Sequence, residues 1–229
     1  MMDISLHYKE KGDGIPIVLL HGNGEDGTYF NNQIEYFSDR YRMIAVDTRG
    51  HGKSPRGCEP FTIEQFAKDL DEWMNERNIS KAIILGFSDG ANIAMKFALQ
   101  YPDKVEALIL NGGNLDAKGV KRGVQIPIEI GYQITRLFAK KSEKAKRNME
   151  LLGLMVNEPN IKPEELHFIQ ASTLVIAGKN DMIKRIHTET IANNIPNAKL
   201  SIIQGDHFIA NKNSEQFNKE VELFLQSID

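Results

Sequence analysis

The sequence has few of the features that mark several large classes of protein. Its one cysteine, Cys58, excludes a disulfide within the chain, and we expect it to be an incidental loop thiol. No stretch approaches the roughly 18 apolar residues that a membrane-spanning helix needs. The N-terminus shows neither the basic nor the apolar segment of a secretion signal. These absences favour a cytoplasmic protein without a membrane span.

Charge and ligand patterns exclude further classes. The formal net charge is −3, so no overall basic field is present to recruit nucleic acid. No metal-ligand spacing occurs, and we expect neither a metal nor a cofactor. The 229 residues contain 41% hydrophobic and 26% charged residues and suffice for one domain with a substantial core. We therefore expect a single domain, 1–229, that acts on a small molecule. The oligomeric state stays open.

The most informative stretch is 86–90, which reads G-x-S-x-G around Ser88. An apolar, β-prone run, 81–85, precedes it, and a run rich in helix formers, 91–100, follows it. This motif at a strand-to-helix turn is typical of a nucleophile elbow, which exposes the serine hydroxyl at the end of a strand. Both glycines are needed there because side chains would collide with the neighbouring strand and helix. The alternative is an ordinary Gly-Ser turn that enters a helix.

Strand and helix patterns alternate along most of the chain. The predicted strands are 4–9, 15–20, 42–46, 81–85, 105–110, 173–177 and 198–203. The predicted helices are 28–37, one that opens at Thr62 with Gln65 as a capping box, 91–100, 187–193 and 214–226. This alternation predicts an open α/β sheet, mostly parallel, with helices on its faces. Ligands bind beyond the carboxyl ends of such strands, where His21, Asp47, Ser88 and Asn111 lie.

The alternation stops between 114 and 170, where no strand is evident. The spacing of apolar residues from 130 to 138 predicts one helix, 143–155 a second, and Pro163 opens a third. We interpret this segment as a helical insertion. Its basic residues are Lys118, Lys121, Arg122, Arg136, Lys140, Lys141, Lys144, Lys146 and Arg147. They either attract an acidic substrate or form a solvated helix surface.

The order of three residues fits nucleophilic catalysis. A serine hydroxyl needs an adjacent base, and histidine suits that role because its pKa lies near neutral pH. A buried carboxylate must then orient the imidazole. Ser88, Asp181 and His207 occur in the chain order Ser, Asp, His, each after a predicted strand. Asp206 is the rival acid, although adjacent side chains orient one another poorly.

Together these pieces resemble the α/β-hydrolase superfamily over nearly the whole chain. The four segments that carry the resemblance are 21–24 (His-Gly-Asn-Gly), 47–54 (D-x-R-G-H-G-x-S), the elbow 86–90, and Gly178-x-x-Asp181 with His207. The resemblance implies an α/β-hydrolase fold with a mostly parallel sheet of about seven to eight strands. A shortened N-terminal hairpin suggests seven. It also implies that the insertion 114–170 is a helical cap.

The resemblance further implies a role for each site residue. Ser88 is the nucleophile, His207 the base and Asp181 the acid, and the backbone N–H groups of Asn23 and Asp89 form the oxyanion hole. We interpret His21, His51 and Asp47 as loop-ordering residues, and His7, His167 and His187 as surface or helix residues. The expected activity is a serine hydrolase, carboxylesterase-like or lipase-like, acting on a small carboxylic ester. Carbon–carbon, thioester or amide hydrolysis and a low-turnover ligand-binding role stay open.

Overall fold

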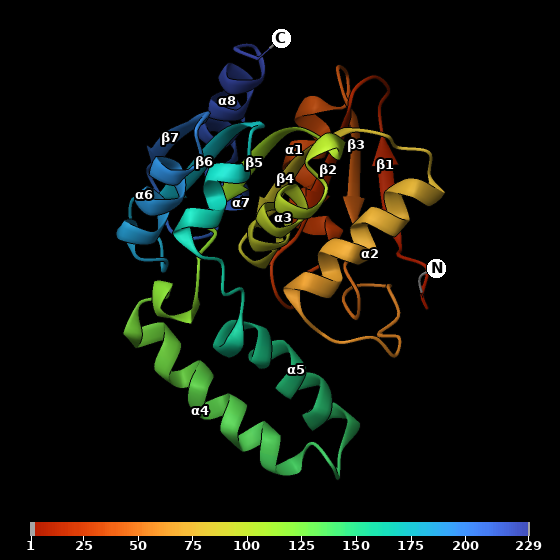
Figure 1. Cartoon of the computed structure of the whole chain (residues 1–229), viewed down its shortest axis with the longest axis vertical. Helices are drawn as coiled ribbons and strands as arrows, with labels where there is room; N and C mark the ends of the chain where they lie inside the picture. Colours follow the sequence, from red (N-terminus) through yellow and green to blue (C-terminus); the bar gives the residue numbers. More distant parts are fainter. Residues whose placement is uncertain (1–2, 229) are drawn as a thin grey trace.

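A seven-stranded sheet organises the computed structural model, which describes residues 3–228 (Figure 1). The strands are β1 Tyr8–Lys11, β2 Pro16–Leu20, β3 Arg42–Val46, β4 Ala82–Phe87, β5 Val105–Asn111, β6 Ser172–Gly178 and β7 Ala198–Ile203. Their spatial order is β1-β3-β2-β4-β5-β6-β7. β1 runs antiparallel to β3, and the six other strands run parallel to one another. The predicted α/β architecture is confirmed.

Helices cover both faces of this sheet. They are η1 Gly27–Phe30, α1 Asn31–Phe37, α2 Ile63–Glu76, α3 Asp89–Gln100, η2 Pro102–Lys104, η3 Ala117–Gly119, α4 Arg122–Phe138, α5 Glu143–Asn157, η4 Pro163–Phe168, α6 Arg185–Asn194, α7 Ile209–Lys212 and α8 Ser214–Leu225. α2, α3, α6 and η4 pack on one face, and η1, α1, α7 and α8 pack on the other. The central strands are therefore buried on both sides, as their continuous apolar sequences predict.

Side-chain alternation divides the core into two layers. Val18 and Leu20 of β2 point into the layer that holds α2 and α3, whereas Ile17 and Leu19 point into the layer under α8. All four side chains are at most 1% exposed. This packing holds the carboxyl end of β2, and with it the loop at 21–24, in a fixed position relative to the neighbouring strand ends.

Three local predictions need correction. The first strand, predicted at 4–9, spans Tyr8–Lys11, because the backbone before it bonds to a loop: His7 N–H donates to Ser54 Oγ over 2.8 Å. Thr62 Oγ1 caps α2 by accepting from Gln65 N–H, but the Gln65 side chain donates to Asp69, so the reciprocal half of the capping box is not made. The helix predicted at Pro163 is a short 3₁₀ helix.

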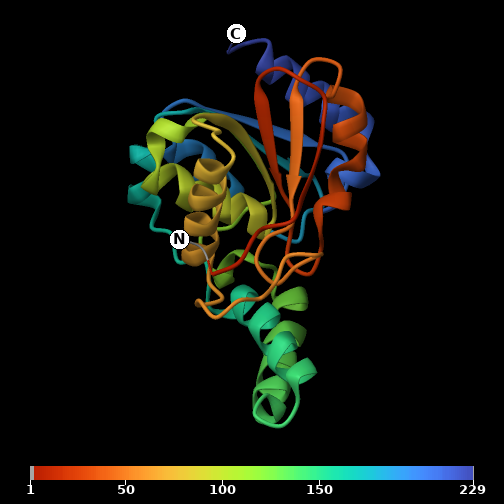
Figure 2. The ribbon, with the colours of Figure 1, turned by 90° about the vertical axis from the view of Figure 1, so that its right-hand side faces the viewer.

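The insertion forms an antiparallel helical hairpin of α4 and α5. It projects from the rim of the sheet, well beyond the helices that cover the core, in both views (Figures 1 and 2). Its two helices approach closely at Gly131, where an added Cβ would lie 3.3 Å from Leu152. The predicted apolar stripe of α4 does not pack against the core, and its residues are largely exposed.

Candidate active site

The elbow around Ser88 has the geometry that the motif predicts. Ser88 lies between β4 and α3 with φ 54° and ψ −119°, a strained conformation for a residue with a side chain. Its N–H donates to Asn111 O over 2.8 Å, which fixes the turn to the neighbouring strand. A Cβ at Gly86 would lie 2.2 Å from Gly90 O, and one at Gly90 would lie 1.9 Å from Leu20 O. The predicted requirement for both glycines is confirmed.

A chain of hydrogen bonds joins Ser88 to two buried residues. His207 Nε2 lies 3.0 Å from Ser88 Oγ, and His207 Nδ1 lies 2.7 Å from Asp181 Oδ1. The side chains of His207 and Asp181 are 3% and 4% exposed. Asp181 Oδ1 also accepts from Ile183 N–H over 2.8 Å, so the carboxylate is held in place from its own loop. A base within reach of the hydroxyl and a carboxylate behind that base are what an activated serine needs.

The ends of β6 and β7 bring these partners together. Asp181 lies in the loop after β6, and His207 follows β7. The two loops meet at Gly178, where an added Cβ would lie 2.1 Å from Asp206 O. The imidazole packs against Gly112 after β5, where a Cβ would lie 2.8 Å from Cε1 of His207. Sequence reasoning missed this second contact, since Gly112 reads only as part of a turn.

The rival acid Asp206 bonds to Phe208 and Lys212, and the carboxylate partner of the imidazole is Asp181. Asp206 Oδ1 accepts from Phe208 N–H over 2.9 Å, and its Oδ2 pairs with Lys212 Nζ at 2.5 Å. The Lys212 ammonium group lowers the pKa of this exposed carboxyl. Asp206 therefore stabilises the loop before α7, whereas Asp181 contacts the histidine.

The two predicted oxyanion donors belong to residues near the serine: Asp89 directly follows Ser88 in the chain, and Asn23 lines the same cavity as Ser88. Asp89 is the first residue of α3, so its N–H has no acceptor within the helix. Asn23 lies in the turn after β2, which Glu25 closes by accepting from Gly22 N–H over 3.2 Å. The Asn23 side chain donates to Leu151 O of α5 over 2.7 Å, so this turn is tied to the insertion.

A small cavity of about 180 Å³ opens onto Ser88 and His207. Its other lining residues are Gly22, Asn23, Glu25, Phe87, Met155, Met182 and Phe208. Four of these are apolar and suit a short acyl group. Glu25 is the charged exception, and its burial raises the pKa of its carboxyl group. Sequence reasoning missed Glu25, and it missed Met155 because nothing local shows which residues of the insertion reach the site.

A larger cavity of about 490 Å³ lies between α5 and the loop at 50–61. None of Ser88, Asp181 or His207 lines it. Arg56 lines this cavity and forms an ion pair with Glu150 of α5 at 2.7 Å. We assign the chemistry to the smaller cavity, because only there do a nucleophile and a base meet.

The carboxyl group of Asp89 makes stability depend on pH. Burial raises its pKa from 3.8 to about 6. The folded state therefore holds the proton more tightly than the unfolded state, and stability falls as the pH rises from about 4 through 6. Asparagine does not titrate, so Asp89→Asn should escape this loss of stability. We expect the unfolding free energy of Asp89→Asn minus that of the wild type to be about 2 kcal/mol larger at pH 7.5 than at pH 4.

Urea unfolding of both proteins at the two pH values measures this effect. Asp13→Asn, a change at an exposed carboxylate, serves as the control. An equal stability difference between wild type and Asp89→Asn at both pH values would show that burial does not perturb this group.

The remaining polar residues of the predicted motifs order loops. Thr48 N–H donates to His21 Nε2 over 3.1 Å, and Asp47 accepts from Gly27 N–H over 2.8 Å. The fully buried Arg49 forms a bidentate ion pair with Asp69, in which Nε and Nη2 each donate to a carboxylate oxygen over 2.7 Å. These bonds agree with the structural roles predicted for this segment, because each satisfies a buried polar group.

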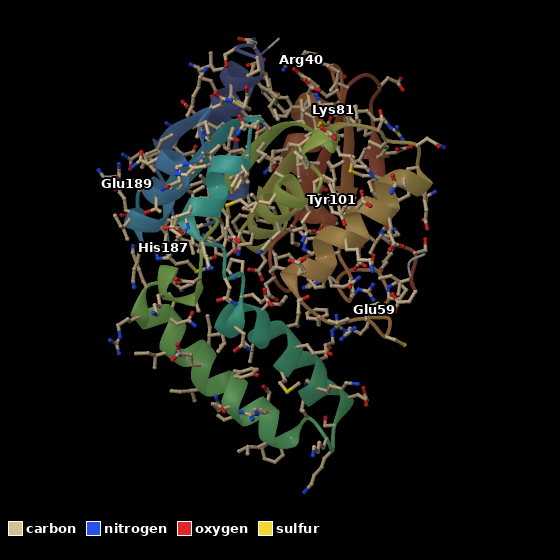
Figure 3. All side chains as sticks on the ribbon, viewed as in Figure 1. Arg40, Glu59, Lys81, Tyr101, His187 and Glu189 are labelled. Carbon is tan, nitrogen blue, oxygen red and sulfur yellow. The ribbon has the colours of Figure 1, made fainter. Side chains whose placement is uncertain are left out.

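Of the other histidines, His7 pairs with Asp47 through Nδ1 and Oδ2 at 2.8 Å, and His51 and His187 also have partners within the fold. His51 Nδ1 lies 3.0 Å from Arg49 O. His187 of α6, labelled in Figure 3, lies at the base of the insertion, where its Nδ1 accepts from Leu115 N–H over 3.4 Å. Neither His51 nor His187 contacts Ser88, so both fit the non-catalytic interpretation made from the sequence.

The side-chain clusters and the helices of residues 3–228 bear on metal binding and on membrane insertion. No group of three or more His, Cys, Asp or Glu side chains in this range is arranged to hold a metal ion. Within the same range, no helix combines the length and apolar character needed to cross a membrane.

Comparison with known proteins places the chain in a family. The sequence model of the alpha/beta hydrolase fold matches residues 15–126. A serine hydrolase of mouse, BPHL, is 28% identical, with 97% of this chain and 84% of the mouse protein aligned. An esterase from Thermogutta terrifontis superposes with a TM-score of 0.82 at 21% identity, over 98% of this chain and 94% of the other.

A meta-cleavage product hydrolase from Pseudomonas fluorescens IP01 superposes with a TM-score of 0.80 at 22% identity, over 99% of this chain and 96% of the other. At such identities the structural matches establish the fold. Together with the family match and the aligned serine hydrolase, they show that this chain belongs to the α/β-hydrolase fold superfamily and has serine hydrolases among its homologues.

Proposed function

We propose that this chain is a serine hydrolase that cleaves a small carboxylic ester by acyl transfer. The observation that carries the proposal is the unbroken chain of hydrogen bonds from Asp181 through His207 to Ser88. Ser88 Oγ attacks the ester carbonyl while His207 Nε2 takes its proton. His207 then gives that proton to the departing alcohol. Water activated by the same imidazole releases the acid and restores the serine.

The other proposed roles concern charge. Asp181 stabilises the imidazolium that forms when the serine loses its proton. The N–H groups of Asn23 and Asp89 hold the oxyanion that develops on the carbonyl oxygen. The position of Asp89 at the start of α3 supports this role, since the helix dipole favours negative charge there.

The choice of a small ester rests on the cavity and on one relative's name. A volume of about 180 Å³ with four apolar lining residues suits a short acyl chain. One structurally similar protein is named an esterase. No lysine or arginine among the described residues lines this cavity, so the basic insertion does not place a cation beside the serine. This argues against the interpretation that those basic residues attract an acidic substrate.

We further propose that residues 1–229 form one α/β-hydrolase domain with a cap at about 114–170. Met155 of α5 lines the cavity, and Leu151 of α5 accepts from Asn23. The insertion thus closes one side of the pocket, as a cap does. Most of its length extends past the pocket into solvent.

A panel of p-nitrophenyl esters with acyl chains of increasing length tests the substrate class. We expect the acetate and butyrate esters to be turned over fastest, with kcat/KM falling at least about tenfold by the octanoate as the chain outgrows the pocket. Matched thioester and anilide substrates should react more slowly. A faster thioester or anilide would reassign the bond cleaved. Tight binding of the acid product without turnover would favour a ligand-binding protein.

A further inference from the structure

The outer face of α4 carries an unusual concentration of exposed apolar side chains. Within the described part of the chain, twelve large hydrophobic residues are exposed, and five of them lie on this one helix. They are Ile126 (43% exposed), Ile130 (56%), Ile134 (52%), Leu137 (76%) and Phe138 (55%). Their helical spacing places them on one face, which we call the α4 stripe. Contiguous apolar surface of this kind marks a binding site on a protein that is otherwise polar outside.

Basic residues surround the end of this stripe. Between 136 and 147 the chain carries six lysine or arginine residues and one glutamate, in a protein with a net charge of −3. This segment spans the end of α4, the turn, and the start of α5, which is the tip of the hairpin. Lys140 and Lys141 lie in the turn directly after Phe138, and both are exposed. Leu137, the most exposed apolar side chain of the α4 stripe, and its neighbour Phe138 therefore adjoin the densest positive charge of the region.

The shape of the molecule makes the tip accessible. The hairpin projects away from the sheet and its covering helices in two perpendicular views (Figures 1 and 2). The start of α5 faces the loop at 50–61, where Arg147 donates to Gly50 O over 3.3 Å. On the side of α4 and the turn, side chains project without other elements beside them (Figure 3). A flat surface could therefore meet the tip and the α4 stripe before it met the core.

We propose that the α4 stripe and the basic tip form a docking surface for anionic phospholipid membranes. Apolar side chains that enter the acyl boundary next to lysines and arginines that meet lipid phosphates are the pattern of a helix lying in a membrane interface. The charge selects a negatively charged surface over a neutral one. The hairpin lies on the membrane and does not cross it.

Charge also argues against a second copy as the occupant. Both ends of α4 are basic. Lys121 is the N-cap residue of the helix and Arg122 is its first residue, while Arg136 lies in its last turn and Lys140 follows it. Two α4 stripes packed against each other in either direction would bring basic ends together. Like charges set against each other across an interface oppose association.

Sedimentation of the full chain with vesicles tests this proposal. We expect binding to phosphatidylcholine vesicles that contain about a third phosphatidylserine, at least about tenfold weaker binding to pure phosphatidylcholine, and weakening as salt rises from about 0.1 M to 0.5 M. Leu137→Ser/Phe138→Ser and Lys140→Glu/Lys141→Glu should each lower the binding at least about tenfold.

Matched controls separate the surface from general effects. Leu223→Ser removes an exposed apolar side chain from α8. Lys68→Glu/Lys219→Glu makes the same charge change at exposed positions on α2 and α8, away from the hairpin. Both should bind vesicles like the wild type. Vesicle binding is measured without turnover, so this test does not depend on the proposed hydrolase activity. All variants should also keep the wild-type turnover of a soluble short-chain ester.

Three results would overturn the proposal. One is no binding to phosphatidylserine vesicles at low salt, and another is equal binding to neutral vesicles. The third is a concentration-dependent dimer in light scattering that Leu137→Ser/Phe138→Ser disrupts, without vesicle binding. That result would make the stripe an interface between copies of the chain.

Discussion

Replacing Ser88 with alanine should lower kcat for a short-chain ester by at least about a thousandfold and leave the fold intact. The variant removes the oxygen that lies 3.0 Å from His207 Nε2, so no covalent intermediate can form. Alanine is smaller than serine and introduces no clash at the elbow. Steady-state hydrolysis of p-nitrophenyl acetate measures the effect, and circular dichroism verifies the fold.

The matched control for this experiment is Ser80→Ala. Ser80 is exposed in the loop before β4 and lies outside the cavity. This variant should hydrolyse the ester at the wild-type rate. Near-normal turnover by Ser88→Ala would show that another group performs the chemistry, whatever the geometry of the elbow.

Replacing Asp181 with asparagine should lower kcat by about a thousandfold or more. The amide keeps the shape of the side chain but cannot stabilise the imidazolium that forms at His207. Asp206→Asn provides the matched comparison, because Asp206 is the next residue to His207 yet bonds to Phe208 N–H and Lys212. We expect Asp206→Asn to change kcat by no more than about threefold.

Kinetics with the two variants side by side decide which carboxylate supports the histidine. A large loss with Asp206→Asn and a small one with Asp181→Asn would reverse our assignment. Equal small losses would mean that the imidazole needs no carboxylate partner in this protein. KM should change little in either variant, since neither carboxylate lines the cavity.

Much of the fold follows from local sequence pattern. The strand ending at Leu20 could be predicted because a continuous apolar run without charge suits a strand buried on both faces. The first strand was misplaced, because apolar alternation reports burial and not backbone pairing. Leu6 is indeed buried, yet the backbone near it bonds to the loop that contains Ser54. Tertiary contacts decided that boundary.

The site residues also divide into those that a local motif predicts and those that tertiary structure places. Ser88 lies in a motif whose two glycines have a purely local cause, and the histidine and aspartate follow strand ends that meet on one rim. Glu25 and Met155 reach the cavity through loop and insertion geometry that no short pattern encodes. In the α4 stripe, the periodicity predicts a helix correctly but does not show whether its apolar face is buried, and the structure leaves that face largely exposed.

Labelling with a fluorophosphonate probe, read by intact mass, tests the central claim most directly, because the probe reacts only with a serine that a neighbouring base activates. We predict one adduct on the wild type and none on Ser88→Ala. The folded wild-type protein staying unlabelled, or Ser88→Ala still being labelled, would contradict the account that Asp181 and His207 activate Ser88.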